Sequence, residues 1–193
     1  MRLREHVDDS EIEKLCEEVI LDHLIYARAE NTAKLFSERL NIKDIQGIDF
    51  LKKRKEICDF ISKKQIEEAF KSIKKYFPFL FETSDETEKK LIDDLFKQMF
   101  IDYVEQGDFQ KAINTAKEFL EKNNFGFDPH VFSILGYSDF ENHNIKKFFN
   151  SERSSKLVEN FNEVIYKRVK GHSNSLLHTL LLHYSSVLYF LNK

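Results

Sequence analysis

The residue types that could carry catalysis or hold a metal are scattered along this 193-residue chain. None of the seven histidines stands in an HExxH or ExxH pattern. His178 and His183 are five positions apart, which is about 140° around a helix, so they cannot share a helix face. The five glycines are isolated and form no phosphate loop or GxSxG turn. Carboxylates occur in patterns typical of a solvated helix surface, such as Glu67-Glu68. We therefore expect no catalytic residues, no metal, no cofactor and no enzymatic activity.

Composition narrows the classes of partner. The net charge is −3 and the pI about 6.2, so charge gives no reason to expect nucleic acid or an anionic membrane as a partner. No apolar run approaches the roughly 20 residues that a membrane span needs, and residues 1–10 are too polar for a signal peptide. The two cysteines, Cys16 and Cys58, fall on apolar stripes, which favours buried free thiols in a reducing compartment. We expect a cytoplasmic protein, with access to the nucleus left open.

The apolar spacing between Arg54 and Leu120 predicts four amphipathic helices. Apolar residues recur there at intervals of three and four, which places each set on one helix face. A single helix cannot bury such a stripe alone, so the four helices must pack on one another. The predicted core of this bundle consists of Ile57, Ile66, Ala69, Phe70, Pro78, Leu80, Phe96 and Phe100.

The rest of the chain is also typical of helices. Capping boxes at Ser10 to Glu13 and at Thr83 to Glu86 each predict a helix start, and Gly107 and Gly171 predict helix ends. Residues 43–49 read as a linker. No segment shows the alternation of a strand or the turn of a hairpin. The predicted fold class is all-α, with roughly nine to ten helices.

Three segments resemble the domains of one scaffold family in the order that the family uses. Arg54, Ile57, Ile61, Gln65-Ile66, Ala69, Pro78, Leu80 and the run from Phe96 to Val104 are similar to a CTLH domain. The preceding helical pair, with Thr32-Ala33 and Phe36, resembles a LisH motif, although Arg28 stands where that motif usually has glycine. The segment containing SILGYSDF and SNSLLHTLLL resembles a CRA domain. The resemblance implies a LisH-like dimerisation motif at 15–42, a CTLH-like bundle at 50–120 and CRA-like helices at 128–193, forming one compact unit.

The same resemblance suggests what the chain does. Short members of the LisH–CTLH–CRA family look like the small scaffold subunit of the GID/CTLH ubiquitin ligase, which is non-catalytic. A RING-bearing subunit needs about eight Cys or His ligands for two zinc ions, mostly Cys, and two cysteines cannot supply them. A SPRY-bearing subunit needs strands that are not predicted here. The expected partners are therefore other LisH–CTLH–CRA subunits, both SPRY-bearing and RING-bearing, in a hetero-oligomer or dimer. A stand-alone helical adaptor unrelated to ubiquitin, or a small α-helical hydrolase, remains an alternative.

The resemblance also suggests where a partner binds, because LisH and the end of CRA form a joint dimerisation surface in the family. The first helix has a broad apolar arc, expected to face inward, and a second, narrow stripe of Leu21 and Ile25. The last helix likewise has a broad arc expected to be core, with Leu182 and Tyr189 outside it. We expect these two narrow stripes to bind a partner. The alternative is that they pack on each other within one chain.

Overall fold

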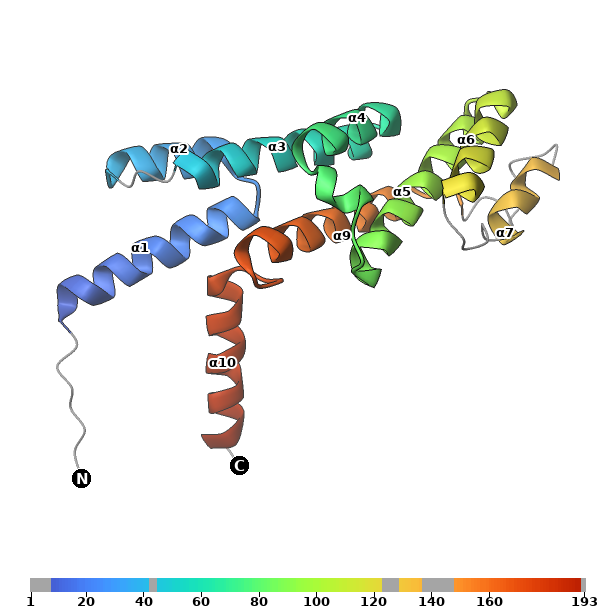
Figure 1. Ribbon diagram of the computed structural model, residues 1–193. Coiled ribbons are helices and arrows are strands. Elements are labelled where there is room, and N and C mark those ends of the chain that lie inside the picture. The colour runs from blue at the N-terminus through green and yellow to red at the C-terminus, as the bar shows by residue number, and fades with distance from the viewer. Residues whose placement is uncertain (1–7, 42–44, 123–128, 137–147, 192–193) are drawn as a thin grey trace. The chain divides into compact units, whose positions relative to one another are not determined.

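The computed structural model describes residues 8–41, 45–122, 129–136 and 148–191 (Figure 1). Within these ranges every regular element is helical, which confirms the all-α prediction. The α-helices are α1 (Asp9–Tyr26), α2 (Glu30–Arg39), α3 (Ile45–Ser62), α4 (Ile66–Tyr76), α5 (Glu86–Glu105), α6 (Phe109–Lys122), α7 (Pro129–Phe132), α9 (Ser151–Lys170) and α10 (Leu176–Leu191). Two 3₁₀ turns, η1 (Pro78–Phe81) and η2 (Ser133–Gly136), follow α4 and α7.

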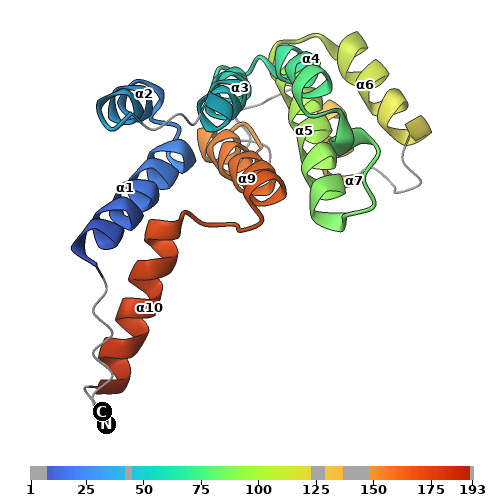
Figure 2. The same cartoon turned by 60° about the vertical axis from the view of Figure 1, so that its left-hand side comes forward.

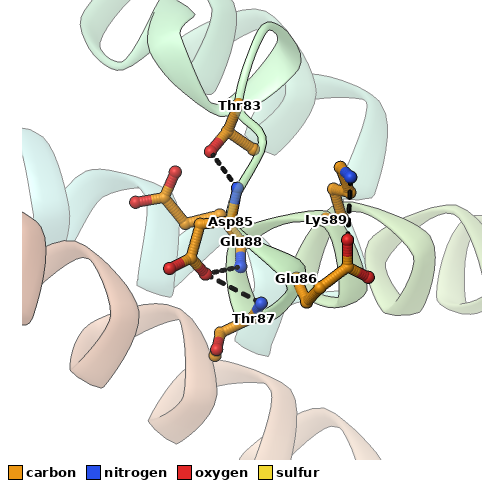
Figure 3. A network of polar contacts seen from close by, with 6 residues as sticks. All are labelled: Thr83, Asp85, Glu86, Thr87, Glu88 and Lys89. Carbon is orange, nitrogen blue, oxygen red and sulfur yellow. Dashed lines mark hydrogen bonds and ion pairs between the residues drawn. The ribbon is translucent and has the colours of Figure 1, made fainter.

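Helix starts lie close to the predicted positions, but aspartates cap them. The side chain of Asp85 accepts hydrogen bonds from the backbone N–H groups of Thr87 and Glu88, at 2.8 and 3.1 Å, and so caps α5 (Figure 3). Thr83, the predicted cap, instead accepts a bond from the Asp85 backbone N–H at 3.0 Å. Asp8 similarly replaces Ser10 as the cap of α1. Both predicted capping boxes are therefore wrong in their capping residue, because a nearby aspartate, Asp8 for α1 and Asp85 for α5, takes the position that accepts from the first free amides.

Glycines end two of the long helices as predicted. Gly107, with a φ of +77°, follows α5, and its N–H donates to the carbonyl of Val104. Gly171, with a φ of +83°, follows α9, and its N–H donates to the carbonyl of Lys167. This left-handed conformation is the one that glycine adopts without steric cost.

The linker predicted at 43–49 is wrong over most of its length, because α3 already begins at Ile45. Gly47, Phe50 and Leu51 are buried, so tertiary packing holds this first part of α3 in a helix despite its glycine. Arg28 adopts a φ of +60° between α1 and α2. The helical pair therefore turns through a left-handed residue at the position where the LisH motif usually has glycine.

The chain divides into two compact units. One consists of Met1–Lys55 with Ile165–Lys193, and the other of Glu56–Val164. The boundaries fall inside α3 and α9, and they differ from the three segments expected from the resemblance, which remain predictions.

The core of the Glu56–Val164 unit is built around phenylalanine rings. The Phe96 ring lies 4.6 Å from that of Phe70 and 5.5 Å from that of Phe119. Seven of the eight predicted core residues are buried: Ile57, Ile66, Ala69, Phe70, Leu80, Phe96 and Phe100. Pro78 is exposed, so its placement in the core is wrong. It begins η1 directly after α4, where its ring stops the helix rather than filling the core.

In the other unit, the predicted inward and outward sides of α1 are exchanged. Leu21 and Ile25 are buried, at 5% and 1% exposure, whereas Ile12, Leu15 and Ile20 are 42–58% exposed. Cys16 is exposed with them, so its predicted burial is wrong, while Cys58 is buried. Both sides of α1 are apolar, and the sequence pattern alone favoured the larger set. Contacts from elsewhere in the chain decide which set packs.

Candidate protein interface

Helix α10 exposes nearly all of its apolar side chains. None of its residues is buried. Ten of its large apolar residues are 39–76% exposed: Leu176, Leu180, Leu181, Leu182, Tyr184, Val187, Leu188, Tyr189, Phe190 and Leu191. We call this set the α10 surface. The predicted core arc of the last helix is therefore wrong, since its members, except the half-buried Leu177, are exposed in the single chain.

Helix α1 packs beside α10 in the same unit (Figures 1 and 2). It adds the exposed residues Ile12, Leu15 and Ile20. Two neighbouring helices thus both present apolar side chains to solvent. Large exposed apolar areas of this kind mark protein interaction sites.

A buried carboxylate fixes the start of α10 on α1. Asp22 lies between Leu21 and Ile25 on the packed side of α1 and is 8% exposed. One of its oxygens accepts a hydrogen bond from the Tyr166 hydroxyl, and the other accepts from the Leu176 backbone N–H at 2.8 Å. The second bond places a negative charge at the N-terminus of α10, where the helix dipole favours it. Asp22 therefore links α1, α9 and α10.

Ser175 provides a second link at the same point. Its hydroxyl accepts from the His178 N–H at 3.2 Å, which caps α10, and it lies 3.0 Å from Nδ1 of His23 on α1. The serine is fully buried. The first turn of α10 is thus held by two polar contacts to α1, while the apolar residues farther along remain uncovered.

Tyr166, which donates to Asp22, packs against aromatic rings and a buried arginine. Arg54 is fully buried, donates to the carbonyl of Ile25, and lies over the rings of Phe50 and Tyr166 at 4.7 and 5.1 Å. The Tyr166 ring meets that of Tyr26 edge to face at 5.0 Å. Burial raises the pKa of the Tyr166 hydroxyl, and the bond to Asp22 raises it further, so this hydroxyl stays protonated and donates at neutral pH.

The structure separates the four residues predicted to bind a partner. Leu182 and Tyr189 are exposed, at 51% and 59%, within the α10 surface. Leu21 and Ile25 are buried, so the expectation that they form an exposed stripe is wrong. The sequence pattern did not predict a role for Asp22 or Tyr166. The available signal was an acidic residue directly beside an apolar stripe, which requires a buried partner once the stripe packs.

Within the described residues, no three His, Cys, Asp or Glu side chains lie close enough to hold a metal ion. In the same part of the chain, no helix has both the length and the apolar character to span a bilayer.

Comparison with known proteins identifies the family to which this chain belongs. The model of the family described as "CTLH/CRA C-terminal to LisH motif domain" matches residues 51–192, and the chain belongs to this family. Residues 15–42, which are predicted to form a LisH-like motif, precede the matched region.

A particular relative is the Schizosaccharomyces pombe protein described as GID complex subunit 8. It is 28% identical to this chain over 120 residues, which are 60% of this chain and 48% of the relative. The chain thus matches about half the length of this relative. No solved structure matches the chain.

Proposed function

We propose that this chain is a non-catalytic scaffold subunit of a GID/CTLH-type E3 ubiquitin ligase. In this role it joins RING-bearing and SPRY-bearing subunits through helical interfaces and takes no part in ubiquitin chemistry itself. The observation that carries the proposal is the α10 surface, which is apolar and exposed, while polar contacts to Asp22 and His23 of α1 hold the start of the helix. Family membership and the similarity to a GID complex subunit support the choice of complex.

The α10 surface suits a partner helix. Leu181, Tyr184, Leu188 and Leu191 recur at intervals of three and four, which is the spacing of a helix–helix seam. Burial of a Leu or Phe side chain contributes about 1.5–3 kcal/mol, so a few of these residues suffice for a stable contact. We propose that another LisH–CTLH–CRA subunit covers α10 together with the exposed side of α1.

Affinity purification of the tagged chain from its native cells, followed by mass spectrometry, tests the choice of complex. The proposal predicts recovery of several LisH–CTLH–CRA subunits in comparable amounts, with RING-bearing and SPRY-bearing members among them. Stable partners that include no such subunit would instead support a stand-alone adaptor. The purified assembly should transfer ubiquitin, and the isolated chain should not.

A further inference from the structure

A groove on the Glu56–Val164 unit runs between α4, α5 and α6. It contains two adjoining cavities, of about 200 and 340 Å³. Glu67, Met99, Tyr103 and Lys111 line both of them. The smaller cavity continues past the start of α4 to Asp102 on α5.

Asp102 is a buried carboxylate, and one of its oxygens has no hydrogen-bond donor among the described residues. The side chain is 3% exposed. Its Oδ1 accepts from Nε2 of Gln98 at 2.7 Å, and Gln98 in turn accepts from Nε of Arg153 at 3.1 Å. No described residue donates to its Oδ2. Gln98 and Arg153 line a different cavity, between α5 and α9, whereas Asp102 lines the groove.

The cations of the smaller cavity are already matched by other carboxylates. Lys64 pairs with Glu105 at 2.5 Å, and Lys111 with Asp108 at 3.1 Å. Glu67, which also lines the cavity, accepts a hydrogen bond from the Tyr103 hydroxyl. Three carboxylates, those of Glu67, Glu68 and Asp102, thus line the cavity against two lysines, and Asp102 is the buried one.

We propose that this cavity receives a basic side chain, lysine or arginine, from a partner protein, and that the cationic group pairs with Oδ2 of Asp102. The apolar stem of such a side chain fits along Met99 and Tyr103. Burying a carboxylate oxygen without a hydrogen-bonded partner is costly, and a cation bonded to that oxygen offsets the cost. The inference goes beyond the proposed function, since it concerns a polar recognition site on α4 and α5 and holds whichever complex the chain joins.

The titration of Asp102 agrees with this geometry. Burial raises its pKa from 3.8 to about 6, although Gln98, Lys64 and Arg153 act to lower it and Glu105 to raise it. A bound cation favours the ionised form. Binding of a basic side chain should therefore weaken as the pH falls below about 6.

The test uses N-acetyl-arginine methylamide as the probe and amide NMR spectra of the full chain as the measurement. The neutral isostere N-acetyl-citrulline methylamide is the matched control. At pH 7.5 the arginine probe should shift the amides of residues 65–68 and 99–103, and the citrulline probe should not. At pH 5 the arginine probe should bind several-fold more weakly to the unaltered protein.

Two substitutions provide the second part of this test. Asp102→Asn keeps the shape of the side chain and should weaken binding of the arginine probe by at least about tenfold. Asp94→Asn, on the same helix but lining the α5–α9 cavity, should leave binding unchanged. Equal binding of the arginine and citrulline probes, or no shift at these amides, would overturn the inference. So would binding to the unaltered protein that does not depend on pH, and this result does not require any variant to fold.

Discussion

The side chain of Asp22 joins α1 to both α9 and α10. It accepts from the Tyr166 hydroxyl and from the first N–H of α10, so two segments more than 140 residues away meet at one carboxylate. Sequence spacing predicts that α1 is a helix but gives no sign of these partners, because they come from long-range packing. The buried core residues of α4 and α5, in contrast, follow from local periodicity.

Loss of the Asp22 carboxylate should destabilise the folded protein. Asp22→Ala leaves a buried hydroxyl and the amide of Leu176 without their acceptor, and we expect it to lower the free energy of unfolding by about 2–4 kcal/mol. Urea denaturation measures the change. Glu18→Ala, an exposed acid on the same helix, should change stability by less than about 0.5 kcal/mol. A comparable loss in both variants would show that Asp22 has no special role.

The pKa of Asp102 predicts a pH dependence of stability. The folded protein binds the Asp102 proton more tightly than the unfolded chain, because the pKa is about 6 when folded against an ordinary 3.8. This contribution is fully present below pH 3.8 and is lost as the pH rises through 6. Asp102→Asn removes it, so the stability of the variant relative to the unaltered protein should increase between pH 4 and 7, by up to about 3 kcal/mol. Urea denaturation at several pH values measures this difference. A difference that stays constant with pH would contradict the raised pKa.

At the scale of the elements, the sequence predicts which segments are helical better than where they start and which way they face. Thr83 and Asp85 are both acceptable caps by type, and only the observed bonds distinguish them (Figure 3). Both faces of α1 are apolar, so its orientation depends on what packs against it. The sequence does not predict the start of α3, because Gly47 disfavours a helix and only tertiary contacts hold this part of the chain helical.

The capping assignment for α5 can be tested directly. Asp85→Ala removes the acceptor for two backbone N–H groups and should lower stability by about 1 kcal/mol. Thr83→Val removes only a contact outside the helix and should cost less. Thermal melts of the two variants measure which one loses more stability. A larger loss for Thr83→Val than for Asp85→Ala would show that Thr83 is the cap.

In the Glu56–Val164 unit, we expect the largest loss of stability when a ring of the phenylalanine cluster of α4, α5 and α6 is removed. Phe96 is 6% exposed and contacts the rings of Phe70 and Phe119. Phe96→Ala should cost about 3–5 kcal/mol through lost burial and the cavity left behind. Chemical denaturation checks this. A loss below about 1 kcal/mol would mean that the ring is not packed as described.

For the whole molecule, the sequence predicts the all-α class and the family, because both depend on patterns that extend over most of the chain. The sequence does not predict that the apolar side chains of α10 are exposed. A helix that is apolar on nearly every side, as α10 is, has the pattern of a core helix. An apolar helix exposed on a single chain makes sense when its core partner belongs to another molecule.

The most direct test of this account measures partner binding after charge is placed on the α10 surface. Leu181 and Leu188 lie two turns apart on one side of α10, at 55% and 39% exposure. The Leu181→Asp, Leu188→Asp double variant and a Val169→Asp control, which alters an exposed residue of α9, would each be tagged and purified from native cells. The account predicts that the double variant keeps its helical circular dichroism and loses the LisH–CTLH–CRA subunits, whereas the control retains them. Undiminished recovery of those subunits with the folded double variant would contradict the account.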